Sequence, residues 1–297
     1  MRLRLPALLL ALGLLSFAPG CTPNIVPPLT AAEFEEKGRV AYEKALESFY
    51  DRDWASVVPK MQAVKREFAG TRWARLAQLR VGDAEFHQAS YTEAVVTFRE
   101  FLREFPNDPD VMYARYKVAE CLFESRGETS LAPPLEERDL VNVRDADRSI
   151  ADFLRDYPNY EKRERLLYMH AWVRGELARH ELYVARYYLK TDRLKAAIAR
   201  TEYALVNFKD TGLEPEALVL LGETYLKQHD TLMAVTAFQL VLEKYATSAF
   251  AEPAKRFLAY VEKTEPGASQ RRASGPLIRS TNEAAPERYG PREVPAP

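Results

Sequence analysis

The sequence predicts an all-α protein in which pairs of helices stack into an extended array. Helix-forming residues dominate the middle of the chain, glycines are few there, and no strand-like alternation runs for more than a few positions. A phrase also recurs: "FREFLREFPND" at 98–108 is followed by "IADFLRDYPNY" at 150–160, "YALVNFKDT" at 203–211 and "FQLVLEKYATS" at 238–248. Such recurrence indicates an internal repeat.

The bulk properties limit the classes of function. The chain has 297 residues, a formal net charge of −1 and 47% hydrophobic residues, enough for one large core or a row of smaller ones. This nearly neutral balance gives no reason to expect nucleic acid as a partner. The two cysteines, Cys21 and Cys121, do not suggest a disulfide framework.

The first 21 residues, MRLRLPALLLALGLLSFAPGC, have the pattern of an export signal. Two arginines precede an apolar run at 5–18, which is shorter than a typical membrane-spanning helix. The segment resembles a bacterial lipoprotein signal, so we expect residues 1–20 to be removed and Cys21 to carry acyl chains. An ordinary secretory signal with an incidental cysteine is the alternative.

Lipidation of Cys21 predicts a location at a membrane surface. Each buried CH₂ of an acyl chain contributes about 0.8 kcal/mol, so two or three chains together give stable anchoring. The next residue is Thr22 rather than aspartate, which by the enterobacterial sorting rule implies the inner leaflet of the outer membrane, on its periplasmic face. Residues 21–30, with three prolines, then form a short lipidated tether.

Segments along the chain align at a spacing of 37 residues. Trp54 aligns with Tyr91 near the N-terminal end, and the same spacing recurs near the C-terminal end. The pattern of small and aromatic residues resembles the tetratricopeptide repeat, an antiparallel helix pair, and the unit 75–108 fits it best. We therefore expect an α-solenoid of about five such pairs over residues 31–263.

The two helices of a pair approach most closely where their side chains are small. In the unit 75–108, Gly82 of the first helix is expected to meet Ala94 of the second. The second helix ends at an aromatic residue, followed in two units by Pro106 and Pro158, because proline cannot continue a helix. The recurring phrase is thus the end of the second helix.

Two parts of the array are irregular. A loop at 126–142 separates the helices of the third unit, and loops of this length are usually functional or disordered. A proline-free stretch at 161–189 predicts a single helix on the order of 43 Å long. The helix 251–263 is expected to cap the stack. Residues 264–297, rich in proline, glycine, serine and charge, are expected to form a disordered tail.

The sequence contains no recognisable catalytic or metal-binding pattern. Its four histidines lie at no metal-ligand spacing, and phosphate-binding loops and hydrolase motifs are absent. Cys121 lies on the apolar side of a helix, which is typical of an inert buried thiol. We therefore expect a protein that is not an enzyme and that needs no cofactor.

The first helices of successive units should line the inner face of the array. In the usual repeat geometry several positions of each first helix point inward, and in the first two units many of these residues are aromatic. Such a groove suits an extended peptide or strand. The alternative is that neighbouring helices cover the rings. The candidate residues are Tyr42, Leu46, Phe49, Tyr50, Leu79, Asp83, Phe86 and His87.

A lipoprotein signal followed by five such units, with a very long helix entering the fourth, resembles the BamD family of outer membrane lipoproteins. The most specific stretches are "HELYVARYYLKTDRLKAAIARTEYAL" at 180–205 and "DADRSIADFLRDYPNY" at 145–160. The resemblance covers about residues 30–260, and the loop 126–142 falls where the family has an insertion.

The resemblance implies a non-enzymatic scaffold in the β-barrel assembly (Bam) complex. In the family, the C-terminal units bind the last periplasmic POTRA domain of the barrel protein BamA, alongside other Bam lipoproteins. The N-terminal units receive the C-terminal signals of unfolded outer membrane proteins. A family arginine that contacts BamA is matched by Arg200, where an exposed guanidinium would pair with a partner carboxylate.

Two other functions remain open at this point. One is a periplasmic tetratricopeptide adaptor lipoprotein for cell-envelope or peptidoglycan coordination, which localisation and partner identity would separate. The other is an enzyme with accessory repeats. Its catalytic domain would have to fit in residues 264–297, which are too few and too polar to fold.

Overall fold

The computed structural model of the chain describes residues 29–126, 134–275 and 277–278, and these residues form helices and no strands. The predicted signal and the predicted lipidation site, Cys21, lie outside the described residues. Within the described part, no helix combines the length and the apolar character needed to span a membrane.

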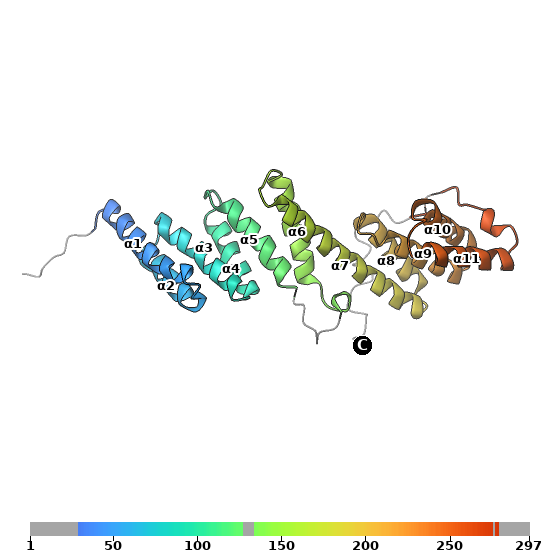
Figure 1. Ribbon diagram of the computed structural model, residues 1–297. Helices are drawn as coiled ribbons and strands as arrows, with labels where there is room; N and C mark the ends of the chain where they lie inside the picture. The colour runs from blue at the N-terminus through green and yellow to red at the C-terminus, as the bar shows by residue number, and fades with distance from the viewer. Residues whose placement is uncertain (1–28, 127–133, 276, 279–297) are drawn as a thin grey trace, which may run out of the picture.

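The described helices form five pairs and a final single helix, which confirms the predicted all-α solenoid. Each helix packs on the next along an elongated array (Figure 1). The pairs are α1 (Ala31–Tyr50) with α2 (Trp54–Glu67), α3 (Arg72–His87) with α4 (Tyr91–Glu104), α5 (Val111–Glu124) with α6 (Val141–Asp156), α7 (Arg163–Lys190) with α8 (Leu194–Asn207), and α9 (Glu214–Lys227) with α10 (Thr231–Lys244), followed by α11 (Ala251–Thr264).

The second helix of every pair ends at an aromatic residue, as the recurring phrase predicts. The backbone N–H of each aromatic residue donates to the carbonyl four positions earlier, which closes the last helical turn. Because each ring is at least partly buried, packing of the ring fixes where the helix stops. These residues are Phe68, Phe105, Tyr157, Phe208 and Tyr245.

The turn inside a pair has a left-handed residue at the same place in four pairs. Arg52, Ala89, Asp192 and His229 have φ between 57° and 63°, and each lies between the first and second helix. This conformation is unfavourable for a residue with a side chain. Its recurrence indicates that packing of the pair dictates the turn.

The closest approach within a pair differs in detail from the prediction. The atoms nearest to the Cβ position of Gly82 belong to the ring of Phe98, although Ala94 is also fully buried. Gly222 of α9 faces Phe238 of α10 in the same register. The missing side chain of the first helix therefore makes room for an aromatic ring of the second.

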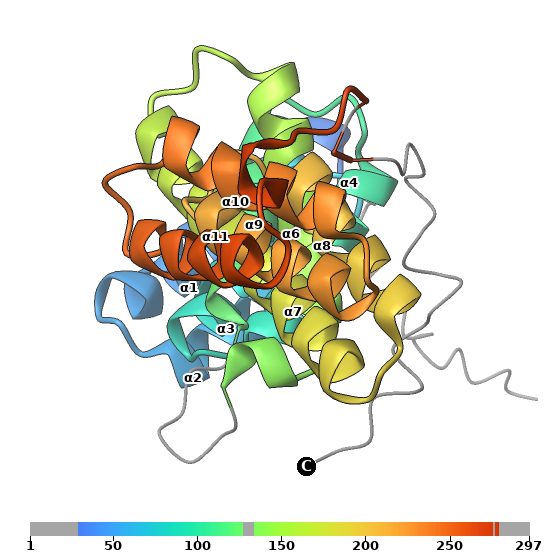
Figure 2. The same ribbon diagram turned by 90° about the vertical axis from the view of Figure 1, so that its right-hand side faces the viewer.

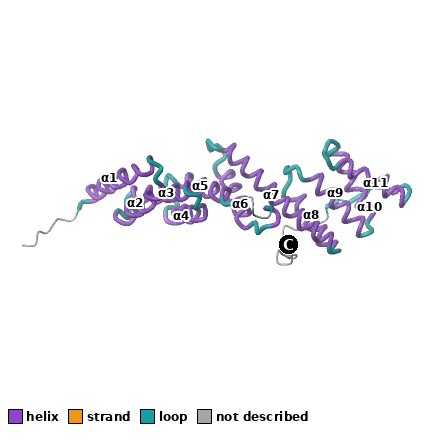
Figure 3. Tube along the Cα trace, turned by 60° about the horizontal axis from the view of Figure 1, so that its bottom comes forward, coloured by secondary structure: helices purple, strands orange, loops and turns teal. Residues whose placement is uncertain are grey.

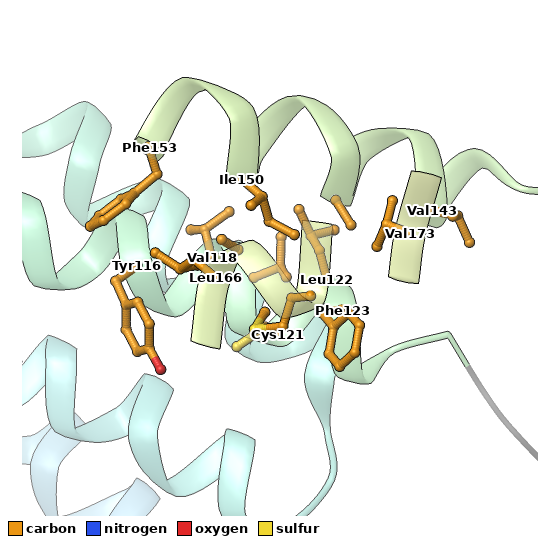
Figure 4. Packing of buried hydrophobic residues seen from close by; sticks show 14 of the residues in the cluster. Tyr116, Val118, Cys121, Leu122, Phe123, Val143, Ile150, Phe153, Leu166 and Val173 are labelled. Carbon is orange, nitrogen blue, oxygen red and sulfur yellow. The ribbon is translucent and has the colours of Figure 1, made fainter. Parts of the chain in front are cut away.

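The hydrophobic core is divided along the array. One cluster of buried side chains joins α1, α2 and α3, a second extends from α3 to α7, and a third extends from α7 to α11. Figure 4 shows part of the second cluster, where Ile150, Leu166 and Leu122 gather near Cys121. Cys121 is fully buried, and burial raises the pKa of its thiol to about 12, as expected of an inert thiol.

The long helix α7 has 28 residues and lies close to the predicted range 161–189. Its N-terminal half places Leu166 and Met169 in the second cluster, and its C-terminal half places Leu182 and Ala185 in the third. It thus connects the two halves of the array (Figure 3).

Part of the predicted loop at 126–142 packs against α7; residues 127–133 lie outside the described residues. A short 3-10 turn, η1 (Leu135–Glu137), places the carbonyl oxygen of Glu136 2.7 Å from Nδ1 of His180. This contact attaches the end of the loop to the long helix.

The packed structure extends beyond the predicted start of the disordered tail. We call residues 265–275 together with 277–278 the C-terminal arm. The carboxylate of Glu262 accepts a hydrogen bond from the backbone N–H of Gly267, which has φ +80°, and a second 3-10 turn, η2 (Ala268–Gln270), follows. The prediction of a disordered tail from residue 264 is therefore wrong for residues 265–275, which pack against the array.

The C-terminal arm then turns back along α10, as Figure 2 shows from the C-terminal end of the array. The backbone N–H of Ala273 donates to Oγ1 of Thr236 at 2.9 Å, and Leu277 is 9% exposed within the third cluster. Residues 279–297 lie outside the described residues.

Candidate functional site

Aromatic side chains from the first three helices meet at one end of the first two pairs. The Trp54 indole stacks on the His87 imidazole with 4.3 Å between ring centroids and 13° between planes. Phe49 meets Trp54 edge-on at 5.1 Å, and Phe86 lies beside His87 at 5.7 Å. We call Phe49, Trp54, Phe86 and His87 the aromatic cluster. The turn of each pair positions it, since its members lie at helix ends.

The aromatic cluster is accessible to solvent. Phe49, Trp54 and Phe86 are only partly buried, and His87 is exposed. Partial burial, helped by the positive charge of Lys117, lowers the pKa of His87 and favours its neutral form. A neutral imidazole stacked on an indole offers a flat, largely apolar surface on which another ring or an extended chain can pack.

A buried lysine borders the aromatic cluster. Nζ of Lys117 lies 3.7 Å from the centroid of the Phe86 ring and 2.8 Å from Oε2 of Glu120. Glu120 also accepts a hydrogen bond from the Tyr116 hydroxyl at 2.9 Å and pairs with Arg165 at 3.0 Å. Burial would raise the pKa of Glu120, but the bond and charge of Lys117 outweigh it and the pKa is lowered. The ionised carboxylate thus holds the lysine against Phe86.

A second polar group joins α1, α3 and α5. Asp83 accepts a hydrogen bond from the Tyr113 hydroxyl at 2.5 Å and pairs with Arg80 at 2.7 Å. The Arg80 guanidinium lies over the ring of Phe49 at 5.6 Å and over that of Tyr113 at 5.8 Å. Burial and the charge of Asp83 raise the pKa of Tyr113. These contacts fix the first helices of three units relative to one another.

Five of the eight candidate groove residues are at least partly accessible. Phe49, Phe86 and His87 come together in the aromatic cluster. Tyr50 is 75% exposed at the end of α1, and Leu46 is partly buried against the first core cluster. The structure therefore brings part of the predicted groove together at one place.

For the other three candidates the expected exposure is wrong. Tyr42 is buried against the Trp73 ring at 5.6 Å, Leu79 belongs to the second core cluster, and Asp83 is bonded to Tyr113. The next first helix contacts Tyr42 through Trp73 and Asp83 through Tyr113, and Leu79 is buried within the second core cluster. At these three residues the alternative expectation, burial inside the array, is the correct one.

Sequence reasoning missed two neighbours of this surface, Trp54 and Lys117. Trp54 holds the repeat position of Tyr91, so the alignment already marked it as a residue of the turn between the helices of a pair. Lys117 has no local signal, because its contact with Phe86 joins α5 to α3.

Arg200 does not lie on the surface, so the expectation of an exposed guanidinium is wrong. It is 4% exposed, and its Nη1 lies 2.9 Å from Oε2 of Glu181, which is also buried. The pair connects α8 to α7 within the fourth unit. An arginine held inside a pair of helices stabilises that pair and is not available to a partner carboxylate.

Among the described residues, no group of histidine, cysteine, aspartate and glutamate side chains could hold a metal ion. The surface around the aromatic cluster contains rings, a paired lysine and a paired arginine. Such a surface can bind another ring or an apolar chain.

Comparison with known proteins shows a family match over most of the array. The family model YfiO, described as "Outer membrane lipoprotein", matches residues 35–231, about two thirds of the chain. A tetratricopeptide repeat model matches residues 216–248, which include most of α9 and all of α10.

Several curated relatives share the name outer membrane protein assembly factor BamD. The Caulobacter vibrioides protein is 28% identical over 207 residues, which are 70% of this chain and 65% of the relative. The proteins of Haemophilus influenzae and Pasteurella multocida are each 25% identical, over 65% and 67% of this chain and 75% and 78% of their own lengths. The match thus spans slightly less than two thirds of the Caulobacter relative.

Proposed function

The chain belongs to the outer membrane lipoprotein family whose model it matches, and on that premise we propose that it acts in the assembly of outer membrane proteins. It is a non-enzymatic scaffold, held by acyl chains on Cys21 at the periplasmic face of the outer membrane. Its C-terminal units bind the POTRA region of a BamA-like barrel protein, beside other Bam lipoproteins.

The aromatic cluster receives the C-terminal signal of an unfolded outer membrane protein. Membrane barrel strands alternate apolar and polar side chains, and aromatic residues gather at the ends of their apolar band. An extended segment ending in an aromatic residue therefore offers rings that can stack on Trp54 and His87 and meet Phe49 and Phe86. The stacked pair of Trp54 and His87, at 4.3 Å, is the single observation that best supports this proposal.

A peptide titration tests the receptor role. The probe is a fluorescein-labelled peptide of alternating apolar and polar residues with a free C-terminal phenylalanine, and its anisotropy is followed as protein is added. Trp54→Ala and Phe86→Ala should each weaken binding about tenfold, since truncating a central aromatic anchor costs at least 1 kcal/mol. Tyr168→Ala, which removes a 67% exposed tyrosine on α7, is the matched control and should bind like the unchanged protein.

Unaltered binding by both cluster variants would remove the aromatic cluster from the receptor role. The scaffold role has a separate readout, purification of the protein from solubilised outer membrane. Recovery of peptidoglycan-synthesis proteins in place of a BamA-like barrel would favour the adaptor function instead.

A further inference from the structure

The repeat places an acidic residue at the same position on α3 and α9. Gly82 and Gly222 hold equivalent positions, since each leaves room for the ring of an equivalent phenylalanine. The next residue is Asp83 on α3 and Glu223 on α9. The surroundings of these two carboxylates differ.

On α3 each oxygen of the carboxylate has a close partner, a hydrogen bond for one and an ion pair for the other. Asp83 is 3% exposed, accepts the hydroxyl hydrogen of Tyr113 at 2.5 Å and pairs with Arg80 at 2.7 Å. One turn further along α5, Lys117 and Glu120 pair with each other at 2.8 Å and occupy the space between the two first helices. The junction between α3 and α5 is thus closed by its own side chains.

On α9 these partners are absent from the sequence. When the glycines are aligned, Leu220 holds the place of Arg80, and Pro253 of α11 holds the place of Tyr113. Glu223 is partly buried and makes no hydrogen bond or ion pair with any other described residue. The charge of Arg186 acts on it from a distance, but that guanidinium pairs with Glu216. Burial raises the pKa of Glu223.

The space between α9 and α11 is an open pocket with a mostly apolar lining. Phe257 and Tyr260 stand where the α5 helix has Lys117 and Glu120, so aromatic rings replace the ion pair. The Phe257 ring stacks on Phe238 at 4.9 Å, which fixes one wall. Tyr260 is 61% exposed at the opening. The remaining lining residues are the apolar Val219, Leu226, Phe250 and Pro253 and the basic Arg256, whose charge is not among those acting on Glu223.

We propose that this pocket binds a segment of a partner protein that carries an arginine or lysine beside an apolar side chain, with the cation pairing to Glu223. The apolar side chain packs on the Phe257 and Tyr260 rings. The cation supplies the bond that Tyr113 and Arg80 supply to Asp83. A half-buried carboxylate without a partner favours a cationic ligand over a neutral one, because a charged hydrogen bond is stronger than a neutral one. The site lies at the opposite end of the array from the aromatic cluster and does not depend on the receptor role (Figure 1).

Two blocked peptides test the proposal with the full chain. One carries a single arginine between two leucines; the other carries neutral citrulline in place of that arginine. The arginine peptide should bind about tenfold more tightly by fluorescence anisotropy, the difference expected for one charged hydrogen bond. Glu223→Gln should remove this difference. The variant is expected to fold, because the carboxylate has no hydrogen bond to lose among the described residues, and thermal unfolding checks this.

The controls separate the pocket from general charge attraction. Glu252→Gln makes the same charge change on α11, where Glu252 is exposed and paired with Lys255 at 2.6 Å, and should leave binding of both peptides unchanged. Equal binding of the two peptides, absence of binding by either, or unchanged selectivity in Glu223→Gln overturns the proposal. A further variant replaces Arg279, Arg288 and Arg292 of the chain's own tail by glutamine. If the arginine peptide binds this variant tenfold more tightly than it binds the unchanged protein, the tail is the occupant of the pocket, and the proposal of a partner protein is overturned.

Discussion

The helix of Gly82 and the ring of Phe98 are in contact so close that a methyl group on Gly82 would lie 2.7 Å from Cζ of Phe98. Real carbon atoms do not approach to this distance, so any side chain at residue 82 displaces the ring or separates α3 from α4. The contact therefore predicts that a side chain at residue 82 lowers the free energy of unfolding.

Gly82→Ala is expected to lower the free energy of unfolding by about 1–3 kcal/mol, the usual cost of overpacking a dense core. Gly175→Ala is the matched control. Its added methyl would meet only Nη2 of Arg179 at 3.6 Å. There the higher helix propensity of alanine should stabilise by about 0.5–1 kcal/mol. Urea unfolding measures both changes, and equal effects would show that the contact with Phe98 carries no strain.

Ala89→Gly should stabilise the protein, which is the opposite of the usual effect of this change. Ala89 has φ 57°, a left-handed conformation that costs a residue with a side chain roughly 1–2 kcal/mol. Glycine removes most of this cost but makes the unfolded chain more flexible, so a net gain of about 0.5–1 kcal/mol is expected. Ala259→Gly on the exposed side of α11 should instead destabilise by about 1 kcal/mol. A loss of stability in Ala89→Gly would contradict the turn geometry.

The buried pair of Arg200 and Glu181 predicts a non-additive double mutant. Removing one charge leaves the other inside the protein, so Glu181→Leu should cost about 3–5 kcal/mol in unfolding free energy. The double variant Glu181→Leu/Arg200→Met should lose much less, because it buries no single charge. If the two single costs simply add, the residues do not interact as a buried pair.

His180 predicts a pH dependence of stability. Burial lowers the pKa of His180 below the value of about 6.5 in an unfolded chain. Smaller influences come from the Glu136 carbonyl and the charges of Glu181, Arg144 and Arg200. As the pH falls below about 6.5, the unfolded chain takes up the proton first, so the free energy of unfolding decreases.

The comparison of pH 7.5 with pH 5.5 tests this sign. The unchanged protein should lose more stability than His180→Gln over this interval in urea titrations. Hydrogen exchange at the η1 turn, which His180 holds through Glu136, should also accelerate at the lower pH in the unchanged protein. Identical pH profiles for the two proteins would rule out a contribution from this residue.

The C-terminal arm should protect its own arginines from trypsin. Leu277→Ser replaces a 9% exposed leucine of the third core cluster, and loss of this burial costs about 1.5–3 kcal/mol. Because this weakens attachment of the arm to the third cluster, cleavage after Arg271 and Arg272 should accelerate at least tenfold. Ser274→Ala, at an exposed position of the arm, should leave the cleavage rate unchanged. An unaffected rate in Leu277→Ser would mean that Leu277 does not hold the arm.

The architecture could be predicted from the sequence because the repeat consists of residue types that have strict steric roles. Gly82 and Gly222 lie opposite Phe98 and Phe238. An aromatic residue also ends the second helix of each pair. The long stretch without proline predicted α7 to within two residues at each end. These signals are local, so spacing along one chain reveals them.

The surface was predicted less well because it depends on contacts between units. Tyr42 is covered by Trp73, and Arg200 turns inward to Glu181, although both positions are exposed in a generic repeat. The arm was also missed, because its composition is that of a disordered tail, while its attachment depends on the burial of Leu277 in the third cluster and on the bond from Ala273 to Thr236.

Because α7 contributes side chains to both the second and the third core cluster, we expect the two halves of the molecule to unfold together. A chain ending before Arg163 would leave the second core cluster without Leu166 and Met169, and a chain beginning after that helix would deprive the third of Leu182. A chimaera that joins half of this chain to half of a relative at the midpoint would therefore disrupt one of the two core clusters. Grafts should transfer the whole helix together with both of its neighbours.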